Sequence, residues 1–529
     1  MRVLFIANFS LVEPLGLLYL AGIAKKLGHT SKILMVKNYD FSLIERTVAE
    51  FKPDLVGFNI YTGSHKQFLS FSQKIRERGV VTVVGGPHPT HFSDSCLPYA
   101  DYVVKGEGFA SFHKILDSRV VPGIIFSQEM LSEGFPTPDR ETFYADSPAH
   151  RNSRIKSSIT SMGCPYTCSY CYNSSYNKLY GGFKLKLRPI DDVISELKEI
   201  KDRWPCEMIY FQDDVLGFDL NWLADFANRY REEVGIPWHA QIRLELTRDS
   251  KRLKLFKEAG CLGITTAIES ADPWIRNSLM KRKMPNELIY DGCRKIKAAG
   301  LKLRTEQMLG VPCGDLGVDL KTLEMNVKIK PDIAWASIFA PYRGTALGEF
   351  CVREGYYNGN NDDLGDSFFS RSTLNFYHND RGWIQNEKAQ RQRVPFSKTE
   401  NERYKGKMII LQNLFNYFAY LPKGHVVANE FIAKEDFTFK TLGDITEKHL
   451  MTNGYSREKL EDMRRSLWLS IKYQTGTNND FELIPHYFTM LPHGDRLAKE
   501  FLVRQVKTFK DLSDITRRHL YDEVLYKIY

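Results

Sequence analysis

The sequence predicts an α/β protein with a doubly wound Rossmann-like domain (residues 1–133), a partial (β/α)6 barrel of the TIM type (158–350) and a mostly helical C-terminal domain (351–529). Two observations support this class. Short β-rich runs alternate with helical patterns up to about residue 350, and long amphipathic patterns replace that alternation afterwards. Strands that alternate with helices form right-handed βαβ units and parallel sheets. A stretch rich in proline and charged residues (134–157) is expected to be a linker.

In the first series, the strands are expected at residues 2–7, 31–36, 55–60, 80–84 and 102–105, and helices at 15–27 and 44–51. Ligands of doubly wound sheets bind at the carboxyl ends of the strands. The segments that follow these strands (8–14, 61–64, 85–88 and 106–108) are therefore candidate binding loops.

In the second series, the strands are expected at 158–161, 208–212, 238–242, 263–267, 302–308 and 333–339, with helices between them, notably at 190–203 and 286–299. Strands joined by crossover helices in this way form a partial barrel, whose functional groups lie at the carboxyl ends of its strands.

The C-terminal domain contains an internal repeat. Residues 417–450 match residues 487–520 without gaps, with Phe439 and Phe509, and His449 and His519, among the paired positions. The match predicts a duplicated helical unit. A structural cap is the favoured role, and a module that closes over substrate is the alternative.

The composition is that of a folded protein of several domains. The 529 residues are 43% hydrophobic and 26% charged. No apolar run reaches the ~20 residues that cross a bilayer, and the N-terminus has no cleavable signal pattern. Basic residues are spread along the chain, so the net charge of +9 does not indicate nucleic-acid binding. Nine cysteines, three of them clustered, do not suggest a disulfide framework, and we expect a reducing cytoplasmic location.

The clustered cysteines carry the strongest functional signal. Cys164, Cys168 and Cys171 form a C-x3-C-x2-C pattern directly after a predicted strand. Three thiolates on one loop can each bind one iron of a [4Fe-4S] cubane, which leaves the fourth iron open to an exchangeable ligand. A structural zinc site is the alternative, but it needs a fourth ligand, for which Cys206 is the only modest candidate.

The order of motifs around this loop resembles the cobalamin-binding radical S-adenosylmethionine family over residues 1–347. The motifs that follow the predicted barrel strands are Phe211-Gln-Asp-Asp214, Gln241-Ile-Arg243, Ala267-Ile-Glu269-Ser270, Met308-Leu-Gly-Val-Pro312 and Pro341-Tyr-Arg-Gly-Thr345. Cys313 stands where the family usually has glycine. The resemblance implies a cluster on the three cysteines and contacts to S-adenosylmethionine from Tyr170, Asp213, Gln241, Arg243, Glu269, Ser270, Gly310 and Tyr342. Tyr170 is expected to pack against adenine.

Four N-terminal motifs resemble the cobalamin-binding domain of the same family: Pro14-Leu-Gly-Leu-Leu-Tyr-Leu-Ala21, Asp54-Leu-Val-Gly-Phe58, Gly85-Gly-Pro-His-Pro-Thr90 and Val104-Lys-Gly-Glu-Gly108. The implied cobalamin contacts are Asn8, Pro14, Tyr61, Thr62, Gly85, Gly86, Pro87, His88, Gly106 and Glu107. The Asp-x-His-x-x-Gly pattern that supplies a cobalt-binding histidine in many cobalamin proteins is absent. We therefore expect cobalamin without a histidine ligand, and a scaffold that binds no cobalamin is the alternative.

The resemblance implies cobalamin-dependent methylation of an unactivated carbon. Carbon–carbon coupling, cyclisation or rearrangement without cobalamin is a second hypothesis, and a cobalamin- or zinc-binding module without catalysis is a third. The expected partners are a small-molecule, lipid or peptide substrate and an electron donor such as flavodoxin or ferredoxin.

Overall fold

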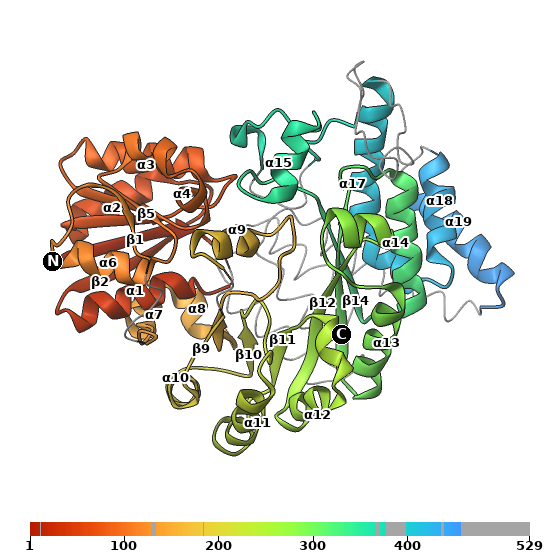
Figure 1. The fold of residues 1–529 in the computed structure, drawn as a ribbon, viewed down its shortest axis with the longest axis horizontal. Coiled ribbons are helices and arrows are strands. Elements are labelled where there is room, and N and C mark those ends of the chain that lie inside the picture. Colours follow the sequence, from red (N-terminus) through yellow and green to blue (C-terminus); the bar gives the residue numbers. More distant parts are fainter. Residues whose placement is uncertain are drawn as a thin grey trace.

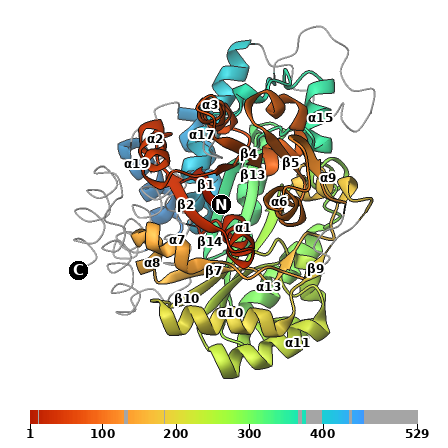
Figure 2. The ribbon, with the colours of Figure 1, turned by 90° about the vertical axis from the view of Figure 1, so that its left-hand side faces the viewer.

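The computed structural model describes residues 1–455, apart from residues 11, 129–133, 183–184, 366–370, 377–397 and 435–438. It contains two six-stranded parallel sheets, with helices around them and after them in the chain (Figure 1). Seen from the N-terminal end, the first sheet lies in front of the second (Figure 2). The predicted α/β class is confirmed.

The first sheet has the strand order β2-β1-β3-β4-β5-β6. Its strands are β1 (Arg2–Asn8), β2 (Thr30–Val36), β3 (Leu55–Asn59), β4 (Val81–Gly85), β5 (Tyr102–Lys105) and β6 (Gly123–Phe126). The last strand was not expected, because the predicted series ended at Lys105. β6 is apolar in sequence (Gly-Ile-Ile-Phe), but it has only four residues, directly follows Pro122 and is only half-buried.

Helices cover both faces of the first sheet, as in a doubly wound fold. Neighbouring residues of β1 point into two different cores: Phe5 packs in a core with α1 (Leu15–Lys26) and α6 (Gly108–Leu116). Ile6 packs in a core with α2 (Phe41–Phe51) and α3 (His65–Arg76). Burial on both faces explains why this strand is almost wholly apolar.

Residues 134–157, which were expected to form a linker, contain regular structure. They hold α7 (Arg140–Asp146), α8 (Pro148–Asn152) and most of the first barrel strand, β7 (Ile155–Ser158). The polar and proline signals mark helix starts: Asp139 accepts a hydrogen bond from the backbone N–H of Thr142 (3.2 Å), and Pro148 occupies the first turn of α8. The barrel strand therefore begins before the expected position at 158.

The second sheet forms the predicted partial barrel, in the order β14-β13-β12-β11-β10-β7, with every pairing parallel. After β7, its strands are β10 (Met208–Phe211), β11 (Trp238–Gln241), β12 (Cys261–Glu269), β13 (Lys302–Leu309) and β14 (Ile333–Ile338). The helices between them are α10 (Ile190–Arg203), α11 (Leu220–Arg229), α12 (Ser250–Glu258), α13 (Asn286–Ala298) and α14 (Leu316–Ile329).

A buried ionic network joins the two sheets. Arg140 of α7 bonds to Glu13, before α1 (2.9 Å), and to Glu196 of α10 (2.6 Å). Glu196 also pairs with Arg188 (2.7 Å), and all four side chains are at least 97% buried. Because removal of one member leaves a buried charge without its partner, such a network fixes the relative position of the elements that carry it.

Beyond α15 (Ala346–Arg353), the described C-terminal helices are α17 (Lys398–Tyr420), α18 (Gly424–Lys434) and α19 (Phe439–Thr452). Helix α17 covers the edge strand β14. Asn416 accepts a hydrogen bond from the Ala334 N–H (2.8 Å), and Gln412 donates to the Ala336 oxygen (3.0 Å). The first repeat copy lies in α17–α19, and the second copy (487–520) lies outside the described residues. In the part of the chain that is described, we find no helix with the length and apolarity of a membrane span.

Candidate cofactor site

The three motif cysteines lie on one loop at the carboxyl ends of the barrel strands. The loop runs from β8 (Ser161–Met162), which pairs with β9 (Lys186–Leu187), to α9 (Tyr172–Leu179). Ser169 fixes its middle by donating from its N–H to the Met280 oxygen (3.0 Å) and from its Oγ to the Leu279 oxygen (2.6 Å). Asn177 fixes its start through the Cys164 oxygen (2.9 Å). The loop conformation is therefore set by the protein itself.

Asp213 holds the chain that leads into this loop. Its carboxylate accepts hydrogen bonds from the N–H of Thr160 (2.9 Å), from Thr160 Oγ1 (2.5 Å) and from Ser161 Oγ (2.6 Å), and it is fully buried. Burial raises its pKa to about 6. The predicted contact of Asp213 with S-adenosylmethionine is corrected, because these internal donors use its oxygens. The neighbouring Asp214 lines the open space beside Cys171 instead.

The thiols of the loop suit a cluster better than a single ion. Burial, together with the nearby Asp214 carboxylate, raises the pKa of Cys164 to about 11 and that of Cys171 to about 12, so iron binding at these thiols releases protons. Among the described residues, no three Cys, His, Asp or Glu side chains converge on one metal ion. A cubane does not require such convergence, because each thiolate binds a different iron.

The zinc alternative with Cys206 as fourth ligand is wrong. Cys206 precedes β10, whose first residue, Met208, pairs with Ile155 at the start of β7. The cysteine loop follows the opposite, carboxyl end of β7, so Cys206 lies at the other end of the sheet.

Two buried arginines flank Cys168. Arg243 Nη1 donates to Cys168 Sγ at 3.0 Å, and its guanidinium lies over the Tyr166 ring, 4.0 Å from the centroid. Arg282 Nη1 lies 3.9 Å from the same sulfur and donates to the Tyr170 hydroxyl (3.0 Å). Arg243, predicted to contact S-adenosylmethionine, thus reaches the cluster loop itself.

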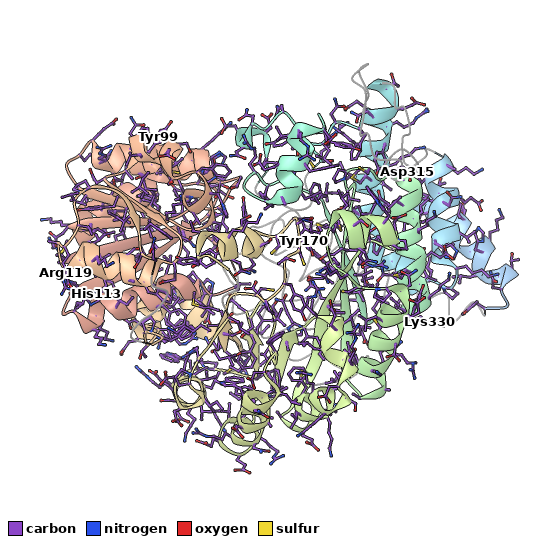
Figure 3. The ribbon with its side chains drawn as sticks, in the orientation of Figure 1. Tyr99, His113, Arg119, Tyr170, Asp315 and Lys330 are labelled. Carbon is purple, nitrogen blue, oxygen red and sulfur yellow. The ribbon has the colours of Figure 1, made fainter. Side chains whose placement is uncertain are left out.

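Tyr170 and Glu269 meet at the centre of the molecule, where Figure 3 places Tyr170. The Tyr170 hydroxyl donates to Glu269 Oε1 (2.6 Å), which also lies 3.5 Å from Arg282. Glu269 has a φ of +68°, at an irregularity in the pairing of β12 with β13. A left-handed conformation costs a non-glycine residue roughly 1–3 kcal/mol, and such strain is concentrated at functional sites.

The other predicted S-adenosylmethionine contacts differ in their surroundings. Gln241 donates to the Tyr210 hydroxyl (3.4 Å), and the Ser270 hydroxyl accepts from the Asp272 N–H (3.2 Å). The Tyr342 ring packs 5.4 Å from Tyr172, the residue after Cys171. These three side chains stay predicted contacts.

Gly310 lies against the C-terminal helices. Its φ is +65°, and a Cβ there would collide with the side chain of Met408 on α17. The missing side chain therefore leaves room for Met408 of α17, and the cofactor contact of Gly310 stays a prediction. Cys313, in place of the family's glycine, also has a left-handed φ of +64°, and its N–H donates to the Tyr356 hydroxyl (3.0 Å). This conformation explains why glycine is usual there.

A cavity of about 560 Å³ lies between the first sheet and the cysteine loop. One wall is the sheet face that carries α1 and α6, including Phe5, Val83 and Gly85. The opposite wall includes Cys171 and Asp214. A Cβ at Gly85 would meet only Val104, at 3.7 Å, so the missing side chain leaves free space. The cavity thus joins the Rossmann-like domain to the cysteine loop.

The cavity separates the predicted cobalamin contacts into two groups. Its walls include Gly85, Gly86, Pro87, Gly106 and Glu107. Asn8, Pro14, Tyr61, Thr62 and His88 lie outside the described lining, and Tyr61 is 55% exposed. Thr62 Oγ1 bonds to His88 Nδ1 (3.0 Å) and to the hydroxyl of Tyr172 (3.3 Å), which does line the cavity. Thr62 therefore links His88 to Tyr172 on the cavity wall, although neither Thr62 nor His88 is among the described lining residues.

Glu107 is the buried acid of this cavity. Its Oε1 accepts from the Phe109 N–H, and its Oε2 has no hydrogen-bond partner among the described residues. Burial raises its pKa to about 7. One oxygen of this carboxyl group is therefore buried in the cavity wall without a hydrogen-bond partner among the described residues.

Comparisons with known proteins agree with this arrangement. A family model described as "B12 binding domain" matches residues 1–116, and one described as "Radical SAM superfamily" matches residues 158–315. The chain belongs to the cobalamin-binding radical S-adenosylmethionine enzymes. Its cofactors as a member of this family are a [4Fe-4S] cluster, S-adenosylmethionine and cobalamin.

Relatives of this radical enzyme include an uncharacterized methyltransferase of Pyrococcus horikoshii, 27% identical, with 64% of this chain and 78% of that protein covered. The cytidylyl-2-hydroxyethylphosphonate methyltransferase of Streptomyces wedmorensis is 25% identical, with 65% and 78% covered. The structure of the cobalamin-dependent S-adenosylmethionine radical enzyme OxsB with aqua-cobalamin bound has a TM-score of 0.59 at 14% identity, with 100% of this chain and 83% of that chain covered. Because only 14% of the aligned residues are identical, this similarity is evidence for a shared fold alone.

Sequence reasoning missed several residues of the radical enzyme's site. Arg282 follows β12 and belongs to none of the motifs. Its position beside Cys168 is seen only in the structure. His91 stacks on Tyr172 with ring centroids 4.5 Å apart, and both line the cavity. Burial lowers the pKa of His91 to about 4, so this imidazole is neutral. The position of Tyr172 directly after the third motif cysteine was an available signal.

Proposed function

We propose that this enzyme transfers a methyl group to an unactivated carbon of a small-molecule, lipid or peptide substrate with the help of cobalamin. The observation that carries the proposal is the shared cavity, whose walls include both the Rossmann-like sheet and Cys171. A reaction that uses two cofactors on one substrate carbon needs both cofactor sites to open into the same space.

The residues are assigned by their position around that cavity. Cys164, Cys168 and Cys171 would hold the cluster, and Gly85, Gly86, Pro87, Gly106 and Glu107 would contact cobalamin. Tyr170, Gln241, Arg243, Glu269, Ser270 and Tyr342 remain the proposed surroundings of S-adenosylmethionine, and Asp214 joins them in place of Asp213.

When bound, the reduced cluster supplies the electron that cleaves S-adenosylmethionine, and cobalamin supplies the methyl group. The protein's own part is to position these groups and to exclude water. Phe5, Leu17, Val83 and Phe112 give the cavity an apolar lining, which suits short-lived radical species. We expect a one-electron donor such as flavodoxin or ferredoxin to reduce the cluster.

The two relatives reported above are both named methyltransferases, which supports methyl transfer over carbon–carbon coupling, cyclisation or rearrangement. A binding module without catalysis is not supported either, because the cysteine loop is held at the carboxyl ends of the barrel strands, where barrel enzymes place their active sites.

The test uses enzyme purified and reconstituted without oxygen. Cys164→Ala is expected to lose cluster iron and the release of 5′-deoxyadenosine from S-adenosylmethionine, whereas the control Cys206→Ala retains both, because Cys206 lies at the other end of the sheet. S-Adenosylmethionine with a deuterated methyl group then tests methyl transfer. Deuterium in an organic product supports the methyltransferase. Cleavage by Cys164→Ala, or cleavage by wild type that never labels a product, contradicts it.

A further inference from the structure

Cys168 differs from the other two motif cysteines in its surroundings. Its sulfur accepts from Arg243 Nη1 at 3.0 Å and lies 3.9 Å from Arg282 Nη1. Arg243, Arg282 and Cys168 are each at least 93% buried. Cys171, in contrast, shares the cavity wall with Asp214. One edge of the loop thus faces two cations, and the other faces an anion.

Both arginines are held firmly at this edge. Arg243 Nη2 donates to the Arg282 backbone oxygen (2.7 Å), and its Nε donates to Glu245 Oε2 (3.1 Å). Arg282 Nη1 donates to the Tyr170 hydroxyl (3.0 Å) and lies 3.5 Å from Glu269. The bond from Arg243 to the backbone of residue 282 couples the positions of the two guanidinium groups.

We propose that Arg243 and Arg282 set the reduction potential of the cluster by donating hydrogen bonds and positive charge to the Cys168 sulfur. This inference rests on the proposed role of Cys168 as a cluster ligand. Reduction adds one electron, from a low-potential one-electron donor, to a cluster in a buried site. Nearby cations and N–H donors to the sulfurs stabilise the added negative charge, so they raise the potential.

Two carboxylates lie beside the arginines, and they allow the proposal to predict the direction in which each substitution shifts the potential. Glu245 pairs with Arg243, and Glu269 lies beside Arg282, so each acid offsets part of the charge that reaches the sulfur. Loss of an arginine should therefore lower the potential, whereas loss of the Glu245 charge should raise it. If the arginines had only a structural role, loss of an arginine and loss of the Glu245 charge would not shift the potential in opposite directions.

The experiment is a redox titration of the reconstituted cluster, followed by the electron paramagnetic resonance signal of its reduced form. The variants are Arg243→Gln, Arg282→Gln and Glu245→Gln. Arg276→Gln is the matched control, because Arg276 is also buried but bonds to the backbone oxygens of Ser270 and Met284 (2.6 and 2.7 Å) rather than to a cysteine.

We expect a lower midpoint potential for Arg243→Gln and Arg282→Gln, a higher one for Glu245→Gln, and a smaller change for Arg276→Gln. Equal potentials in wild type, Arg243→Gln and Glu245→Gln would overturn the inference, and so would shifts of the same sign. If Arg243→Gln or Arg282→Gln does not retain iron, Glu245→Gln, which keeps both arginines, decides by the direction of its shift. A wild-type protein that assembles no cluster would refute the proposed function instead.

Discussion

At the scale of single residues, neighbouring side chains of one motif take different roles. The sequence places Asp213 and Asp214 together after a strand, and the resemblance favoured Asp213 as a cofactor contact. The turn after β10 directs Asp213 into the loop that precedes Cys164 and leaves Asp214 on the cavity wall. The motif could therefore be predicted, but not which carboxylate faces the ligand, because that depends on the backbone path beyond the strand.

Glu107 provides a test at the same scale. Burial raises the pKa of Glu107 from 4.5 to about 7, because the folded protein favours the protonated carboxyl group. The stability that this protonated form contributes is fully present below the unfolded-state pKa and is lost as the pH rises through 7. A difference of one pKa unit corresponds to ~1.4 kcal/mol. Ionisation of Glu107 in the folded protein should therefore lower the free energy of unfolding by on the order of 3 kcal/mol. Wild type without cofactors should lose stability relative to Glu107→Gln between about pH 5 and pH 8.

Denaturant unfolding of both proteins across this pH range measures the difference. Glutamine keeps the size of the side chain and one acceptor for the Phe109 N–H but cannot ionise, so it isolates the effect of charge. Unfolding free energies that run parallel for the two proteins would show that Glu107 is not held in an environment that opposes its charge.

At the scale of elements, the sequence predicted most strands and helices, including α10 at its observed bounds, Ile190–Arg203. The errors have local causes. Residues 134–157 were interpreted as a linker because capping residues and helix-starting prolines resemble loop composition. The contact of Gly310 with Met408 was not predicted, because Met408 lies about a hundred residues further along the chain. Contacts of that kind cannot be inferred from a local pattern.

Helix α17 gives the prediction that belongs to this scale. Asn416→Ala removes the acceptor for the Ala334 N–H on the edge strand, and an unsatisfied buried N–H costs about 1–3 kcal/mol. The free energy of unfolding should fall by this amount. Asn228→Ala, at an exposed position of α11, should change it by less than about 0.5 kcal/mol. Equal effects of the two substitutions would mean that the hydrogen bond from Ala334 to Asn416 does not stabilise the edge strand β14.

At the scale of the whole molecule, the arrangement of the two sheets creates the functional site. Each domain could be predicted from its own motifs, but the shared cavity could not, because it depends on contacts between distant segments. The buried network of Glu13, Arg140, Arg188 and Glu196 and the stacking of His91 on Tyr172 provide such contacts. The assignment of the Rossmann-like cavity to cobalamin is the central claim that follows from this arrangement.

The most direct test is the amount of cobalamin and iron retained by wild type and by Gly85→Leu after anaerobic reconstitution. Gly85 lines the cavity, and a Cβ there meets only Val104, so leucine fills the space with little strain on the fold. We expect stoichiometric cobalamin in wild type, and loss of cobalamin with full cluster iron in Gly85→Leu. A wild-type protein that holds its cluster but no cobalamin, or a variant that retains cobalamin as well as wild type does, would contradict it.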